Sequence, residues 1–158
     1  DVVIVDSVRT GLTKAFRGSF NLTRSDDMLA HCIDSLLDRN PNVGADEVED
    51  VVVGAATHAG EQDGNIARLA VILSKLPVTA AGVSINRFCS SGLQAIAIAA
   101  NQIASGQTEV AIAGGVDSIS MRTRQEPGKA KQNQRLLDEK VHSELPILPS
   151  PAASEESG

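Results

Sequence analysis

Short runs of β-branched residues alternate along this chain with longer segments that have helical spacing. The runs are VVIV at residues 2–5, VVV at 51–53, VSINR at 83–87 and VAIA at 110–113. The intervening segments place apolar residues at helical intervals and end at Pro41, Pro77 and Gly106. Strands that alternate with helices form β–α–β units. The sequence therefore predicts an α/β fold with four strands in a mainly parallel sheet, and VVIV suits a strand covered on both faces.

The first helix has the clearest amphipathic pattern. Its apolar face consists of Met28, Leu29, Cys32, Ile33, Leu36 and Leu37. Ser25 or Thr23 can cap its start, and Asp26 and Asp27 suit the positive end of the helix dipole. This pattern places Cys32 in the core.

Composition excludes several classes of function. The chain of 158 residues is 42% hydrophobic but 2% aromatic and has no Trp or Tyr, so it offers no aromatic surface for stacking bases. A net charge of −6 disfavours nucleic-acid binding. No apolar run approaches the roughly 20 residues that span a bilayer. The two cysteines lie far apart, which predicts neither a disulfide framework nor a metal site and favours a reducing compartment.

The composition changes near residue 121. Residues 124–158 are polar, contain four of the six prolines and end in PSPAASEESG. A weak helical stripe is formed there by Leu136, Leu137 and Val141. We expect an α/β domain at residues 1–123 and a polar tail at 124–158 whose last ten residues are disordered.

Cys89 stands where the third strand passes into a helix that is apolar nearly all round, within NRFCSSGLQAIAIAA. Such a helix is expected to be buried on every side. The N–H groups and partial positive charge at its start stabilise a thiolate and can hold an oxyanion. Most free cysteines, however, are small buried residues of the core, and Cys89 could be one of them. Position alone leaves both interpretations open.

Four segments in the same order resemble the N-terminal half of the thiolases. NRFCSSGLQAI and VAIAGGVDSIS are similar to the active-cysteine segment and the following strand and turn, while VIVDSVRT with GSF and EVEDVVVGAATHAGEQDGNIAR agree upstream. The resemblance covers about residues 1–123. It implies the thiolase α/β fold, with a mixed, mainly parallel sheet and a buried central helix after the nucleophile.

The resemblance implies that Cys89 is the catalytic nucleophile of an acyltransferase. Cys89 would take the acyl group of a 3-ketoacyl-CoA as a thioester and pass it to free CoA, or catalyse the reverse condensation. CoA is then a substrate, and no metal or tightly bound cofactor is needed. SSG after the cysteine resembles the degradative 3-ketoacyl-CoA type of fatty-acid β-oxidation more than acetyl-CoA acetyltransferases. The expected partners are acyl-CoA and further copies, in a homodimer or dimer of dimers joined through residues 83–88.

The chain departs from the family in two respects. The family's activating His lies in Gly-His-Pro and its acid/base Cys in Cys-x-Gly, and neither motif occurs here. Of His31, His58 and His142, His58 alone is placed near a candidate site. The tail does not follow the family's CoA-binding loop domain, although DEKVHSELPI resembles its closing segment. Two alternatives remain: a ketoacyl synthase-type condensing enzyme, and a non-catalytic thiolase-like subunit or truncated fragment.

Other short signals are less specific. Gly114 and Gly115 follow a strand, but G-x-G-x-x-G is absent, so they predict close backbone approach rather than a dinucleotide site. Arg9, Arg17 and Arg68 could hold phosphates or be solvated. We expect a cytoplasmic protein, or a peroxisomal or mitochondrial one in a eukaryote.

Overall fold

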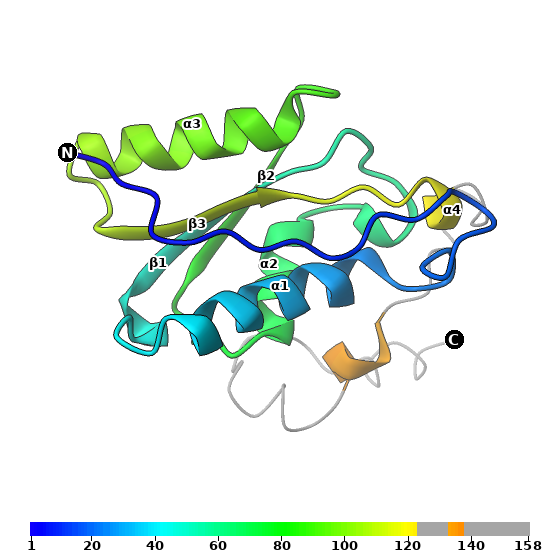
Figure 1. Ribbon diagram of the computed structural model, residues 1–158, viewed down its shortest axis with the longest axis horizontal. Coiled ribbons are helices and arrows are strands. Elements are labelled where there is room, and N and C mark those ends of the chain that lie inside the picture. The colour runs from blue at the N-terminus through cyan, green and yellow to red at the C-terminus, as the bar shows by residue number, and fades with distance from the viewer. Residues whose placement is uncertain (123–132, 138–158) are drawn as a thin grey trace, which may run out of the picture.

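The computed structural model describes residues 1–122 and 133–137. Three parallel strands, β1 (Val48–Gly54), β2 (Ala81–Ile85) and β3 (Val110–Gly115), form a sheet in the order β2–β1–β3. The helices are α1 (Ser25–Arg39), α2 (Ile66–Leu73), α3 (Ser91–Ala104) and the short α4 (Ile119–Arg122), with 3-10 turns η1 (Ala45–Glu47), η2 (Gly60–Gln62) and η3 (Gln134–Leu137). Figure 1 shows α3 over one face of the sheet and α1 and α2 over the other. The α/β prediction is confirmed.

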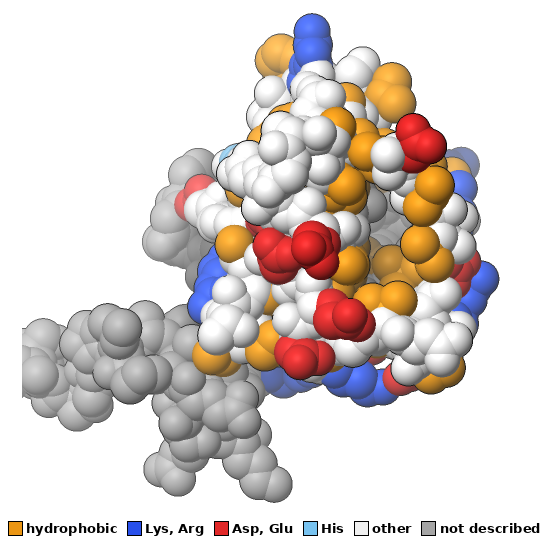
Figure 2. Space-filling view, turned by 90° about the vertical axis from the view of Figure 1, so that its left-hand side faces the viewer, with side chains coloured by type: hydrophobic (Ala, Val, Ile, Leu, Met, Phe, Trp, Pro, Cys, Tyr) orange, Lys and Arg blue, Asp and Glu red, His pale blue; other side chains and the backbone are white. Residues whose placement is uncertain are grey.

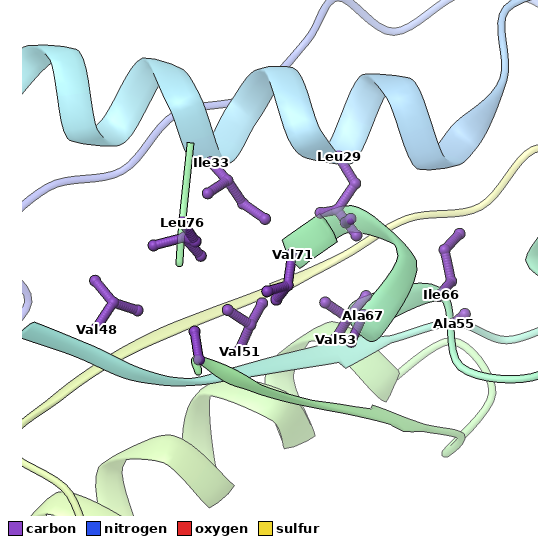
Figure 3. Packing of buried hydrophobic residues seen from close by; sticks show 12 residues of the cluster. Leu29, Ile33, Val48, Val51, Val53, Ala55, Ile66, Ala67, Val71 and Leu76 are labelled. Atoms are coloured by element: carbon purple, nitrogen blue, oxygen red, sulfur yellow. The ribbon is translucent and has the colours of Figure 1, made fainter. Parts of the chain in front are cut away.

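The central strand β1 is buried on both faces, which explains its uninterrupted valines. Val51 and Val53 are at most 1% exposed and belong to the cluster that includes Ile33 of α1 and Val71 of α2 (Figure 3). Val52, which is 0% exposed, packs with Ala95 and other small residues of α3 on the opposite face. Each fully buried valine stabilises the fold by about 1.5–3 kcal/mol.

The predicted first strand at residues 2–5 is wrong. Val3, Ile4 and Val5 are 74%, 78% and 72% exposed and belong to no strand. The described sheet therefore has three strands rather than four, although β2 and β3 each keep an unpaired outer edge. The N-terminal segment is held instead by Asp6, which accepts hydrogen bonds from Arg39 (2.8 Å) and Asn40 (2.9 Å) at the end of α1.

Residues 8–15 enclose a cavity of about 550 Å³ with the apolar face of α1 and with β3. Cys32 lines this cavity and is half-buried rather than part of the close-packed core. Burial nevertheless raises the pKa of its thiol. Figure 2 shows a hollow edged by apolar side chains at the end of the molecule from which the strands start.

A buried carboxylate, rather than a capping hydroxyl, satisfies the start of α1. The N-cap residue is Arg24, which makes no side-chain capping bond, and Ser25 is already the first helical residue. The Ser25 N–H and hydroxyl both donate to Oε1 of Glu61, at 2.9 and 2.8 Å. Glu61 comes from η2 and is 4% exposed. The predicted cap by Ser25 or Thr23 is therefore wrong, because a distant side chain supplies the acceptor.

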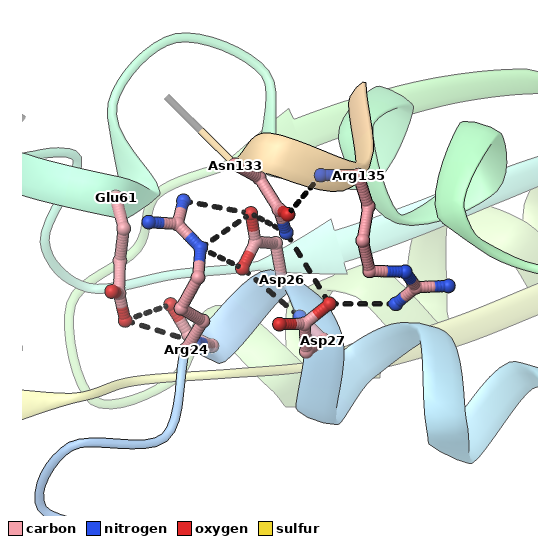
Figure 4. Close-up of polar contacts among 7 residues, drawn as sticks. Arg24, Asp26, Asp27, Glu61, Asn133 and Arg135 are labelled. Atoms are coloured by element: carbon pink, nitrogen blue, oxygen red, sulfur yellow. Dashed lines mark hydrogen bonds and ion pairs between the residues drawn. The ribbon is translucent and has the colours of Figure 1, made fainter. Parts of the chain in front are cut away.

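The same helix start is tied to η3 (Figure 4). Asp26 is fully buried and accepts hydrogen bonds from Arg24 at 2.9 Å and from Asn133 at 3.1 Å. Arg135 forms an ion pair with Asp27 at 2.7 Å. Residues 133–137 of the polar segment thus pack onto the α/β domain. Val141 and the last ten residues lie outside the described residues.

We predict that Glu61→Gln changes how stability depends on pH. Burial raises the pKa of Glu61 above its ordinary value of 4.5, although Ser25 and Arg24 act in the opposite direction. The native state then binds this proton more tightly than the unfolded state, so the stabilisation is complete below pH 4.5 and is lost as pH rises through the raised pKa. A glutamine keeps an acceptor oxygen for Ser25 but carries no charge.

Urea unfolding of both proteins at several pH values from 4 to 7 measures this effect. The free energy of unfolding of the wild type should fall relative to that of Glu61→Gln as pH rises. A difference that stays constant over this range would show that the Glu61 carboxyl is not destabilised by burial.

Candidate active site

Cys89 lies in the turn that joins β2 to α3, at the edge of the sheet where all three parallel strands end. β2 ends at Ile85, Ser90 is the N-cap residue of α3, and Cys89 precedes it directly. The side chain of Cys89 is exposed. The carboxyl ends of parallel strands are where α/β folds bind ligands. The structure therefore places the cysteine at the start of the helix, as predicted, and open to reagents.

The strand before the cysteine ends two residues earlier than predicted. The sequence indicated residues 83–87, whereas β2 spans Ala81–Ile85. Asn86 already belongs to the turn, since its Oδ1 accepts a hydrogen bond from the Phe88 N–H at 2.8 Å. The short side chain of an asparagine competes with strand pairing in this way.

Glycines let the start of α3 touch the sheet directly. A Cβ atom on Gly54, at the end of β1, would lie 2.2 Å from the Ser91 carbonyl carbon and 2.5 Å from the Gly92 nitrogen. A Cβ atom on Gly115 of β3 would lie 3.3 Å from the Gly92 Cα. Close backbone approach, predicted for the glycine pair, therefore holds for Gly115, whereas Gly114 faces open space with nothing within 4 Å of its Cβ position.

The predicted burial of α3 on all sides is not observed. Ser91, Ala95 and Ala99 are buried against the sheet, but Leu93 and Ile96 are 72% and 43% exposed. The reason is that α1 and α2 lie on the opposite face of the sheet, so no described element covers the outer face of α3 (Figure 1). An apolar helix surface consequently begins one turn beyond Cys89.

Polar side chains join the two loops that follow β1 and β3 at the same edge of the sheet. Gln62, 1% exposed, donates to the Thr57 carbonyl at 2.8 Å and accepts from the Ser118 N–H at 2.6 Å. Asp117 accepts from the Ala56 N–H at 3.0 Å. Gln62 and Asp117 are not among the candidate residues predicted from the sequence. Both residues lie in segments that follow predicted strands, and this position could have indicated them.

The histidine and arginine candidates occupy other positions. His58 lies in the loop after β1, half-buried, with its Nε2 3.0 Å from the Ala55 carbonyl oxygen, so its ring is engaged by main chain. His31 is exposed on α1, and His142 lies outside the described residues. The guanidinium of Arg68 donates to the Ala80 carbonyl at 2.6 Å, just before β2 and away from Cys89.

Arg9 and Arg17 are exposed on the N-terminal segment. Within residues 1–122 and 133–137, no group of three or more His, Cys, Asp or Glu side chains is arranged to hold a metal ion. No helix in that part of the chain has the length and apolarity to cross a membrane.

Comparisons with known proteins agree with the geometry. The family model described as "Thiolase, N-terminal domain" matches residues 2–149. A beta-ketoadipyl-CoA thiolase of Pseudomonas putida is 45% identical over 120 residues, which are 76% of this chain and 30% of that protein. The 3-oxoadipyl-CoA/3-oxo-5,6-dehydrosuberyl-CoA thiolase of Escherichia coli strain K12 is 41% identical with the same coverage. A 3-ketoacyl-CoA thiolase of Aliivibrio salmonicida is 41% identical over 75% of this chain and 31% of its own length.

The chain spans about 30% of the length of these relatives, and the matched part is their N-terminal region. The family model covers nearly the whole chain, including the turn with Cys89 and the three strands that end beside it. This chain belongs to the thiolase family.

Proposed function

We propose that this chain carries the nucleophile of a thiolase, Cys89, and transfers acyl groups between 3-ketoacyl-CoA and CoA. The observation that supports this most is the exposed position of Cys89 directly before the 14-residue helix α3. A helix start presents N–H groups and a partial positive charge to a thiolate and to an oxyanion. Cys32, half-buried on α1, has no such setting.

In this proposal the reaction has two steps. The Cys89 sulfur forms a bond to the 3-keto carbon, the bond between carbons 2 and 3 breaks, and the released enolate takes up a proton to give acetyl-CoA. The sulfur of a second CoA then attacks the acyl-cysteine thioester, Cys89 leaves as a thiolate, and a shortened acyl-CoA is released. The reverse sequence condenses two acyl-CoA molecules.

The proton transfers need groups that these 158 residues do not supply, because the Gly-His-Pro and Cys-x-Gly motifs are absent from them. We propose that these groups come from a further thiolase domain. The length of the relatives and the exposed Leu93 and Ile96 on the outer face of α3 support such a domain. A non-catalytic thiolase-like chain is the second candidate, and the missing motifs are what favour it.

The substrate class in this proposal is a 3-ketoacyl-CoA. The names of the relatives, beta-ketoadipyl-CoA and 3-ketoacyl-CoA thiolase, support this class and include substrates with a second carboxylate. A ketoacyl synthase-type enzyme would instead condense with loss of carbon dioxide. Phe88 before the cysteine and Gly92 after the serines fit a thiolase better.

Replacement of Cys89 tests the proposal. In an enzyme form that includes the further domain, Cys89→Ala and Cys89→Ser should each lower the rate of CoA-dependent thiolysis by at least about a thousandfold, since a hydroxyl is a much weaker nucleophile at neutral pH. Cys32→Ala is the matched control and should retain activity. A Cys89→Ser enzyme with near-native turnover would exclude Cys89 as the nucleophile.

We also propose a homodimer, or a dimer of dimers, joined through β2. In the described sheet β2 is an edge strand with Val83 38% exposed, so its outer edge can accept a second strand. The Ile85 carbonyl accepts from the Ala55 N–H of the chain after β1. Alternate residues of a strand point their backbone groups to opposite sides, so Ser84 turns its own to the outer edge. Two-fold pairing of this edge gives an isologous interface.

Ser84→Pro tests this interface, because proline removes the outward N–H. Ser84 also accepts from the Ala67 N–H at 3.0 Å through its hydroxyl, so Ser84→Ala, which loses the hydroxyl alone, is the control. In light scattering the proline variant should be monomeric while the alanine variant keeps the oligomeric state of the wild type. A Ser84→Pro dimer would place the interface elsewhere.

A further inference from the structure

The residue before Cys89 has an uncommon backbone conformation. Phe88 has φ = 50°, in the left-handed region, although it is not a glycine. This conformation costs about 1–2 kcal/mol for a residue with a Cβ atom. Phe88 is 76% exposed, so burial of its side chain does not offset the cost. Other contacts must hold the turn in this form.

The Ser91 side chain makes two of these contacts. Ser91 is 3% exposed, and its hydroxyl accepts a hydrogen bond from the Arg87 N–H at 2.8 Å and donates one to the Phe88 carbonyl at 2.6 Å. It therefore joins the N–H of the residue before Phe88 to the carbonyl of Phe88 itself. With one donor and one acceptor engaged inside the turn, the hydroxyl is oriented toward the backbone rather than toward a substrate.

Asn86 completes the arrangement from the other side. Its Oδ1 accepts from the Phe88 N–H at 2.8 Å, and its Nδ2 donates to the Ala56 carbonyl in the loop after β1 at 3.1 Å. Both backbone polar groups of Phe88 are thus bonded to side chains. A strained residue that its surroundings hold in place is characteristic of functional sites.

The neighbouring serine has a different setting. Ser90 is exposed, and as the N-cap residue of α3 it makes no side-chain capping bond. The two serines that follow Cys89 are therefore chemically alike but structurally distinct. This difference supplies a matched control.

We propose that Ser91 is a positioning residue for Cys89. By holding Phe88 in the left-handed conformation, the buried hydroxyl fixes the direction in which Cys89 leaves the turn and keeps its sulfur near the first N–H groups of α3. Asn86 assists by anchoring the same turn to the loop after β1. This inference rests on the proposed role of Cys89 as the nucleophile.

The test is the rate at which iodoacetamide alkylates Cys89 in the native chain at pH 7 and pH 9, followed by peptide mass spectrometry, which separates Cys89 from Cys32. Ser91→Ala should slow alkylation of Cys89 at pH 7 by on the order of tenfold and should slow it less at pH 9, because misplacement weakens the stabilisation of the thiolate. Ser90→Ala should leave both rates within about twofold of the wild type. Alkylation of Cys32, half-buried on α1, reports whether the fold is intact.

If Ser91→Ala does not fold, Asn86→Ala takes its place, since the Asn86 side chain is exposed and still bonds to Phe88. It should show the same selective loss at pH 7. Folded variants at Ser91 or Asn86 that react like the wild type would overturn the inference, as would an equal effect of Ser90→Ala. Wild-type Cys89 that reacts no faster than in the urea-unfolded chain would instead contradict the proposed nucleophile itself.

Discussion

The contact between Gly54 and the start of α3 sets the geometry of the whole candidate site. At this point the backbone of β1 touches the backbone of Ser91 and Gly92, and no side chain fits between them. Gly115 brings the end of β3 against the same turn of helix. The ends of β1 and β3 thereby fix the distance between α3 and the sheet at the start of the helix. Since Cys89 precedes this helix by one N-cap residue, they also fix where the cysteine emerges.

The two faces of the sheet are packed with side chains of different size. Against α1 and α2, large residues such as Ile33 and Val71 form a close-packed core around β1. Against α3, small residues such as Ala95 and Ala99 let the helix approach the sheet, while Leu93 and Ile96 remain exposed on its outer face. The exposed apolar residues on the outer face of α3 suit a protein in which a further part packs against this helix. The proposed further domain has this role.

Much of the fold could be predicted from the sequence where local pattern and tertiary packing agree. The valines of β1 and Leu29 and Ile33 of α1 are buried as expected, because burial is what their spacing encodes, whereas Cys32 of the same stripe lines a cavity. The VVIV run at residues 2–5 has the composition of a strand but forms none, because composition does not report contacts such as those that bind Asp6 to Arg39 and Asn40 at the end of α1. The start of α1 depends on Glu61, 36 residues away from Ser25, and no local capping pattern could indicate that contact.

For the site, the sequence correctly located Cys89 at a helix start but not the contacts that hold it. The two serines of SSG look equivalent in the sequence, but in the structure Ser91 is buried and Ser90 is exposed. The glycine pair after β3 was likewise treated as one feature, although Gly115 meets the helix and Gly114 does not. Such distinctions depend on which backbone lies opposite, and the sequence around each residue does not contain that information.

The most direct test of this account compares urea unfolding of Gly54→Ala with that of Gly114→Ala. A methyl group on Gly54 would collide with the Ser91 backbone, whereas one on Gly114 meets nothing within 4 Å. We predict that Gly54→Ala lowers the free energy of unfolding by at least about 2 kcal/mol, because α3 must shift to admit the methyl group. Gly114→Ala should change it by no more than about 1 kcal/mol. Equal effects of the two substitutions would contradict the claim that a side-chain-free contact seats the helix behind Cys89.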